Sequence, residues 1–106
     1  TFCYIADAVR AMRLLMESEK TDSRPIETVH IGDFQEITMG DLLDKLFSVA
    51  GWRPNRIEIK DAVAGSVSRR LADVSKLQKL TGWQPEVSLE EGLKRTFAWY
   101  KVNPKK

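Results

Sequence analysis

Hydrophobic residues recur at helical spacing in four stretches of the chain, and each stretch has a start or stop signal beside it. In the first stretch, apolar residues repeat every three or four positions, which predicts a helix that Asp7 caps and that ends near Glu19. We expect its apolar stripe to face the core, and this stripe contains Val9, Met12, Leu15 and Met16.

A second amphipathic stretch follows Thr38 and predicts a helix capped by that residue, with Asp41 three positions further on. Gly51 is expected to end this helix, because glycine adopts the left-handed backbone of a helix terminus without a steric penalty. Its expected buried face consists of Leu42, Leu43, Leu46, Phe47 and Val49.

A short third helix is predicted inside the stretch from Gly65 to Pro85. Asp73 or Ser75 can cap its start, because either side chain can accept a hydrogen bond from a first-turn amide. Gly82 offers the left-handed backbone that ends a helix. The residues expected to pack along this helix and at its exit are Leu77, Leu80, Trp83 and Pro85.

The last helix is expected to start at Ser88, since Ser88 and Glu91 have the spacing of a capping box. Its apolar stripe consists of Leu89, Leu93, Phe97 and Tyr100. Each tryptophan follows or completes an apolar pattern, so packing rather than ring stacking is expected for Trp52, Trp83 and Trp99.

Three short stretches have the alternation or the β-branched content of strands, namely residues 1–5, 26–31 and 56–60. Residues 21–25 are polar with a closing proline and predict a surface loop. The order along the chain is strand, helix, strand, helix, strand, loop, helix, helix. This order predicts an α/β or α+β fold over residues 1–106, with about four helices against a small sheet.

Composition narrows the classes of partner. Seventeen Lys and Arg against fifteen Asp and Glu leave a net charge of +2 with both signs interspersed, which argues against nucleic-acid binding. The single Cys3 excludes an internal disulfide and His is scarce, so we expect no metal site and a reducing cytoplasmic location. No apolar run approaches the roughly twenty residues that cross a bilayer. The basic residues Lys101, Lys105 and Lys106 are typical of a solvated tail.

The adjacent Arg69 and Arg70 are the candidate binding residues. Two guanidinium groups near the Gly65 turn and a helix start suit recognition of phosphate oxygens. The alternative is that they pair with surface carboxylates such as Asp61 or Asp73. Composition alone leaves both interpretations open.

Catalytic signals are weak in this sequence. His30 is the only histidine and has no evident catalytic partner, so a structural role is expected for it. The chain contains neither a Gly-x-Gly-x-x-Gly loop nor a Walker loop for a bound phosphate. Glu90 and Glu91 lie in a first helical turn, where acidic residues favour the positive end of the helix dipole.

Three blocks, which together cover nearly the whole chain, have the order and spacing of a known family. They are TFCYIADAVRAM, VHIGDFQEITMGDLL and RRLADVSKLQKLTGWQPEVSLEEGLKRTFAWY. The last block contains an Asp-x-x-Lys helix, a Gly-aromatic-x-Pro turn and an acidic pair before Gly. It resembles the closing signature of the extended short-chain dehydrogenase/reductases, the NAD-dependent nucleotide-sugar epimerases, dehydratases and decarboxylases.

The resemblance implies that the chain is the carboxyl-terminal, substrate-binding lobe of a Rossmann-type enzyme and clamps the nucleoside diphosphate of a nucleotide sugar. Arg70 matches a position that in several members carries an arginine or tyrosine touching the nucleotide, and Arg69 is its neighbour. Both are therefore the expected substrate-binding residues. Asp73 and Lys76 match the Asp-x-x-Lys motif, whose role in the family is chiefly structural.

The sequence departs from the family pattern in three places. Val63 stands where the family often has an arginine for the diphosphate, and Ser66 stands where it often has an acidic residue for the ribose. His30 replaces the usual Asn.

The resemblance also implies NAD(P), bound by an amino-terminal Rossmann domain that is absent from the chain. Members of the family commonly form homodimers through helices of that missing half. Their catalytic Tyr-x-x-x-Lys also belongs there, because neither Tyr4 nor Tyr100 is followed four positions later by Lys. No catalytic, cofactor-binding or metal-binding residue is therefore expected among these 106 residues.

Two other functions remain open. The chain can belong to a family member that has lost catalysis and acts as a binding or regulatory module. It can also be a free-standing α/β interaction domain in which Arg69 and Arg70 meet an acidic partner, and that hypothesis predicts an intact mass matching 106 residues.

Overall fold

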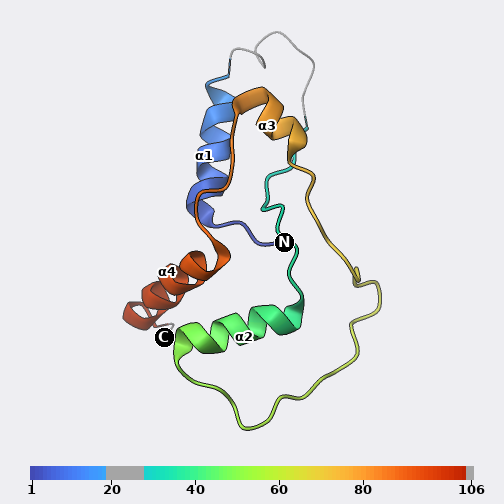
Figure 1. Ribbon diagram of the computed structural model, residues 1–106, viewed down its shortest axis with the longest axis vertical. Helices are drawn as coiled ribbons and strands as arrows, with labels where there is room; N and C mark the ends of the chain where they lie inside the picture. Colours follow the sequence, from blue (N-terminus) through green and yellow to red (C-terminus); the bar gives the residue numbers. More distant parts are fainter. Residues whose placement is uncertain (19–27, 105–106) are drawn as a thin grey trace.

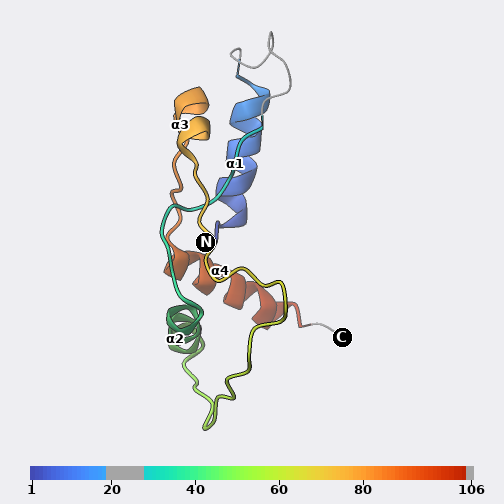
Figure 2. The ribbon, with the colours of Figure 1, turned by 90° about the vertical axis from the view of Figure 1, so that its right-hand side faces the viewer.

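A computed structural model describes residues 1–18 and 28–104, and these residues form four helices (Figure 1). The helices are α1 (Ile5–Met16), α2 (Met39–Ala50), α3 (Ser75–Thr81) and α4 (Leu89–Val102). Helix α1 packs on α3, and α2 packs on α4. Figure 2 shows the two pairs one above the other along the length of the molecule. Each pair therefore combines one helix from the first half of the chain with one from the second half.

The predicted small sheet does not form in the part of the chain that the structure describes. Residues 1–4, 28–31 and 56–60 are non-helical and carry no strand pairing, and α1 already begins at Ile5. A strand requires a neighbouring strand for its backbone amides and carbonyls, and alternation of side chains alone cannot supply one. The sheet prediction is wrong here, whereas the four helices are confirmed. The loop predicted at 21–25, residues 26–27 and the two last lysines lie outside the described residues.

Two of the predicted amino-terminal caps are confirmed. The Thr38 hydroxyl oxygen accepts a hydrogen bond from the Asp41 amide at 3.1 Å and begins α2. The Ser88 hydroxyl oxygen accepts one from the Glu91 amide at 3.3 Å and begins α4. Each bond satisfies a first-turn amide that has no partner within its helix.

The predicted helix ends are also confirmed. Gly51 and Gly82 adopt left-handed backbone with φ of 65° and 70°, which a residue with a Cβ adopts only under strain. At the start of α3, Val74 occupies the cap position, and the Asp73 carboxylate accepts a hydrogen bond from the Ser75 amide at 3.0 Å. Asp73 therefore accepts a hydrogen bond from the first turn of α3 although it lies one residue before the cap position.

The buried core lies between α1 and α3. It consists of Ala11, Val74, Leu77 and Trp83, of which Trp83 is only 1% exposed. The prediction that Trp83 packs is confirmed. Trp52 and Trp99 are 65% and 57% exposed and contact Phe47 and Tyr100 edge-on, so the packing prediction is wrong for these two within the described residues.

Asp7 joins α1 to the segment that leads into α4. It lies inside the first turn of α1, not at the cap as predicted, and is 2% exposed. One carboxylate oxygen accepts hydrogen bonds from the amides of Glu86 and Val87, at 3.1 and 2.9 Å. The other accepts a bond from Arg10 at 3.2 Å, and the Asp7 carbonyl accepts one from the Trp83 indole at 3.0 Å. We call this group the Asp7 corner.

The amino-terminal segment packs on α4 at Gly92. A Cβ built on this buried glycine would lie 3.1 Å from the Tyr4 ring, which is tighter than ordinary contact. The Arg95 guanidinium lies over the Tyr4 ring, with its central carbon 5.6 Å from the ring centre. The glycine after the acidic pair of α4 is therefore explained by the close approach of Tyr4.

The predicted apolar stripe of α1 is largely exposed in the described residues. Val9, Met12 and Met16 are 54%, 52% and 83% exposed, whereas Leu15 is half-buried. The radius of gyration is 17.2 Å, against about 13 Å for a compact domain of this length. The accessible surface is 8810 Å², against about 6000 Å² for a compact protein of this mass. The chain is elongated and leaves much apolar surface uncovered.

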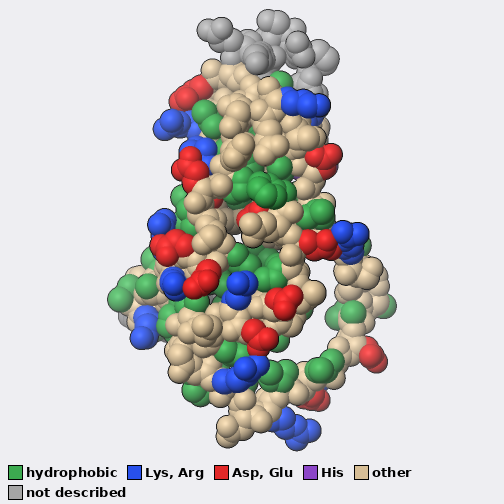
Figure 3. Space-filling view, in the orientation of Figure 1, with side chains coloured by type: hydrophobic (Ala, Val, Ile, Leu, Met, Phe, Trp, Pro, Cys, Tyr) green, Lys and Arg blue, Asp and Glu red, His purple; other side chains and the backbone are tan. Residues whose placement is uncertain are grey.

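Residues 52–72 form a long excursion between α2 and α3 (Figure 1). Figure 3 shows open space between this segment and the body of the molecule. Its exposed apolar side chains are Trp52, Ile57, Ile59, Val63, Val67 and Leu71. Within the described part of the chain these residues are 47% to 93% exposed, and the ion pairs that join the segment to the rest of the molecule lie near its two ends, at Arg53 and Arg69.

Candidate functional site

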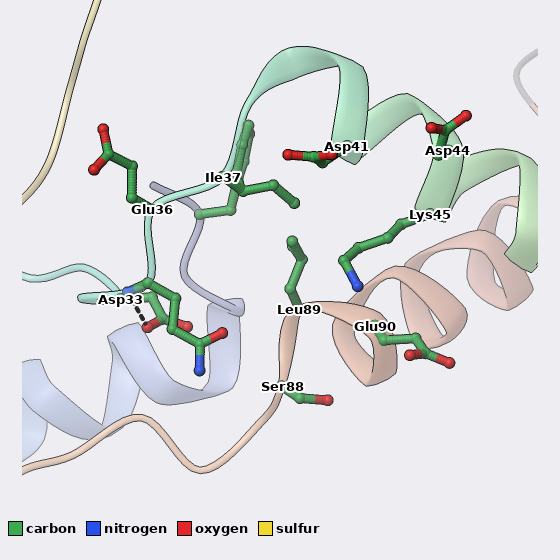
Figure 4. A pocket seen from close by; sticks show the side chains of 11 residues that line it. Asp33, Glu36, Ile37, Asp41, Asp44, Lys45, Ser88, Leu89 and Glu90 are labelled. Carbon is green, nitrogen blue, oxygen red and sulfur yellow. Dashed lines mark hydrogen bonds between the residues drawn. The ribbon is translucent and has the colours of Figure 1, made fainter.

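A cleft of about 560 Å³ opens between the amino-terminal ends of α2 and α4 (Figure 4). Segment 33–37 forms its third side. The caps at Thr38 and Ser88 fix where the two helices begin, and so they fix the shape of this opening. The lining residues are Phe2, Asp33, Gln35, Glu36, Ile37, Asp41, Asp44, Lys45, Ser88, Leu89 and Glu90.

Five of the eleven residues that line the cleft are carboxylates, and each has a partner. Asp33 accepts a bond from the Gln35 amide at 2.9 Å, and Asp41 accepts one from the Thr38 hydroxyl at 2.6 Å. Asp44 pairs with Arg53, Glu90 with Lys94, and Glu36 with Arg69. Hydrogen bonding from Lys94 lowers the pKa of Glu90. Among the lining residues themselves, these carboxylates outnumber the single basic residue, Lys45. The lining is therefore acidic, which disfavours a phosphate inside the cleft.

Arg69 binds Glu36 at the margin of this cleft. Its Nε and Nη2 atoms donate to Glu36 Oε1 and Oε2, at 2.5 and 2.7 Å. This two-bond arrangement matches the planar fork of arginine to both carboxylate oxygens. Hydrogen bonding to the partner lowers the pKa of Glu36 and raises the pKa of Arg69. In Figure 4 the Glu36 carboxylate points away from Asp41 and Lys45.

Arg70 differs from its neighbour. Its side chain is exposed and makes no hydrogen bond or ion pair to any described residue. Its backbone carbonyl accepts a hydrogen bond from the Thr1 nitrogen at 3.2 Å. Arg69 therefore pairs with a surface carboxylate, but with Glu36 and not with Asp61 or Asp73. The Arg70 guanidinium has no hydrogen-bond partner among the described residues.

Sequence reasoning missed two residues that shape this region. Glu36 lies 33 positions before Arg69, and no local pattern connects the two. Asp7 did carry a signal, because it is a carboxylate inside the apolar run YIADAV, and a buried carboxylate needs several donors. His30 is exposed.

Neither a membrane-spanning helix nor a metal-binding cluster is found in the part of the chain that the structure describes. None of the four helices has the length and apolar character to cross a bilayer. Residues 1–18 and 28–104 hold no group of three or more His, Cys, Asp or Glu placed to bind a metal ion.

A protein-family model described as GDP-mannose 4,6 dehydratase matches residues 1–96. The chain is similar to GDP-L-fucose synthase 1 of Arabidopsis thaliana, with 37% identity over 74% of this chain and 24% of that protein. It is also similar to UDP-glucuronic acid decarboxylase 6 of the same plant, with 32% identity over 88% of this chain and 25% of that protein.

The fold of the chain also matches part of a solved structure of an enzyme that acts on a nucleotide sugar. The crystal structure of a UDP-glucose 4-epimerase with UDP-glucose from Thermotoga maritima matches with a TM-score of 0.81 and 31% identity. The match covers 97% of this chain and 31% of the epimerase. The chain spans about a quarter to a third of the length of the curated relatives it matches.

Proposed function

Since this chain belongs to the nucleotide-sugar epimerase and dehydratase family, we propose that it holds the nucleoside diphosphate of a nucleotide-sugar substrate. The supporting observation is its close structural match to an epimerase crystallised with UDP-glucose. The proposed enzyme is a cytoplasmic isomerase or lyase of carbohydrate metabolism, and the chain is its substrate-binding lobe. The base and the sugar are left to the experiment below.

The proposed enzyme uses NAD(P), but the residues of this chain do not fit that cofactor. The sequence has no Gly-x-Gly-x-x-Gly loop, and Tyr4 and Tyr100 lack the lysine four positions later. We therefore assign hydride and proton transfer to a Rossmann domain elsewhere in a longer polypeptide, and no chemical step to these residues. Formation of a homodimer is proposed for that same domain.

The exposed apolar surface supports this assignment. The α1 face of Ile5, Val9 and Met12 and the side chains of segment 52–72 would be costly to leave in water. A cofactor domain that packs on them would remove part of that area from solvent. The large surface of the chain, compared with a compact protein of its mass, has the same explanation.

In the proposed site, Arg69 is paired with Glu36, which lines the cleft, and the adjacent Arg70 has its hydrogen-bond donors free in the described residues. A guanidinium donates charge-assisted hydrogen bonds to phosphate oxygens, and it keeps its charge at any physiological pH. The anionic lining of the neighbouring cleft directs the diphosphate to the arginine side.

The test is a titration of the complete protein with UDP-, GDP- and dTDP-sugars by calorimetry, with NADH absorbance followed in parallel. Arg70→Ala is expected to weaken binding of the preferred nucleotide sugar by about 10-fold to 100-fold. Arg56→Ala is the matched control, because Arg56 is an exposed arginine of the same segment without an ion pair among the described residues. An unchanged dissociation constant for Arg70→Ala would contradict the proposed site.

Intact mass spectrometry of the natural protein separates the alternatives. A mass well above that of 106 residues eliminates the free-standing interaction domain. Nucleotide-sugar binding with no conversion of any sugar to a product, followed by NMR of the sugar, would favour a family member without catalysis.

A further inference from the structure

The two adjacent arginines have different surroundings. Arg69 uses Nε and Nη2 for the two oxygens of Glu36, at 2.5 and 2.7 Å, so one edge of its guanidinium is occupied. Arg70 makes no side-chain hydrogen bond or ion pair within the described residues. An approaching anion therefore meets a neutralised pair at position 69 and a full positive charge at position 70.

The Glu36–Arg69 pair also lies where the long excursion returns to the body. Residues 54–68 make no hydrogen bond or ion pair to any described residue outside that range. At position 69 the chain is tied to Glu36, and three residues later Ala72 reaches Gly32, where an added Cβ would lie only 2.8 Å from the Ala72 Cβ. Among the described residues, the Glu36–Arg69 pair is therefore the first side-chain ion pair with the rest of the molecule after residue 53, and it comes directly before Arg70.

We infer that Glu36 is a positioning residue: it holds Arg69 as an anchor so that Arg70 alone presents its guanidinium to the diphosphate. This inference rests on the proposed function. The inference assigns different roles to Arg69 and Arg70, although their adjacency in the sequence suggests one shared role. Arg69 fixes the backbone beside the site, and Arg70 makes the contact with the phosphate oxygens.

The sign of one measurement distinguishes positioning from simple charge effects. Glu36→Gln removes a negative charge near the site, and by charge alone it would tighten binding of an anion. If Glu36 positions Arg70, the same variant weakens binding. Glu58→Gln is the control, because Glu58 is an exposed carboxylate on the excursion that carries Arg69, and among the described residues its only ion pair is with Lys60.

The experiment measures UDP and GDP binding to the complete protein by calorimetry, and the thermal unfolding midpoint of each variant. Glu36→Gln is expected to weaken binding by up to about fivefold, the range of exposed ion pairs. Its unfolding midpoint is expected to stay at the wild-type value, and Glu58→Gln is expected to bind at least as tightly as wild type. Adding Glu36→Gln to Arg69→Ala should cause no further loss, because both changes remove the same contact.

A charge swap completes the test. The double variant Glu36→Arg with Arg69→Glu re-forms an ion pair, and it should restore affinity to within about twofold of wild type. Tighter binding by Glu36→Gln, or a swap variant as weak as Arg69→Ala, would overturn the inference. If Arg70→Ala still weakens binding in that case, the proposed function stands. Loss of nucleotide binding by the wild-type protein itself would overturn both.

Discussion

The Asp7 corner and the excursion at residues 52–72 use charged side chains in opposite ways. At the corner, the buried Asp7 carboxylate accepts hydrogen bonds from Arg10 and the amides of Glu86 and Val87, and the Asp7 carbonyl accepts one from the Trp83 indole. On the excursion, Arg53 and Arg69 are exposed, and each pairs with a single carboxylate outside it, Asp44 and Glu36. The corner fixes how α1 meets the chain before α4, whereas the charged side chains of the excursion stay exposed to solvent.

Because one region is buried and the other exposed, their charged groups are expected to contribute differently to the free energy of unfolding. A buried charge survives only with a full set of donors, and removing one member leaves the others unsatisfied. An exposed pair exchanges its partner for water at little cost. The same types of residue therefore hold the fold in one region and only orient a side chain in the other.

The largest effect is expected from Trp83→Ala at the corner. The ring is 1% exposed and its indole donates to the Asp7 carbonyl, so truncation should lower the free energy of unfolding by about 3–5 kcal/mol. Trp52→Ala on the excursion should cost less than about 1 kcal/mol, because that ring is 65% exposed. Guanidinium unfolding followed by circular dichroism measures both. Equal losses would show that another part of the protein covers Trp52.

An intermediate effect is expected from Asp7→Asn. The amide keeps the shape of the side chain but loses the charge that accepts three hydrogen bonds, so we expect a loss of about 1.5–3 kcal/mol in unfolding free energy. Glu36→Gln makes the corresponding change in the exposed region and should leave stability unchanged. Comparable losses in the two variants would contradict the contrast between the regions.

A smaller effect is expected from acidification. Burial tends to raise the pKa of Asp7, but hydrogen bonds from the Val87 and Glu86 amides and from Arg10 outweigh it, so the pKa lies below its ordinary value of 3.8. The stability that Asp7 contributes is therefore complete above about pH 5, and it is lost as the pH falls through the lowered folded-state pKa. Asp7→Asn should flatten this part of the curve of unfolding midpoint against pH. An unaltered acid slope in the variant would assign the slope to other carboxylates.

Local signals predicted the helices well because a helix satisfies its backbone within one stretch of sequence. Thr38, Ser88, Gly51 and Gly82 act where the pattern placed them. The strands failed because pairing depends on a neighbour that no local pattern supplies. The prediction that the α1 stripe is buried failed for a similar reason. Apolar spacing shows that a helix face is suited to burial, but it does not show which other element covers that face.

The site was predictable only in part. The adjacent Arg69 and Arg70 indicated the binding segment, but no local pattern distinguishes one from the other, because the partner of Arg69 lies 33 positions away at Glu36. Asp7 was assigned to a cap because caps are the common use of Asp before a helix. Its real partners, Glu86 and Val87, follow 79 and 80 positions later.

The interleaved pairing of the helices has a consequence for how the chain can be divided. A break within the excursion would separate α1 and α2 from α3 and α4, so neither piece would keep both members of a pair. Each piece alone would lack the surface it packs against, while the two mixed together could rebuild both pairs. The excursion is thus a natural place to split the gene and recover the fold by complementation.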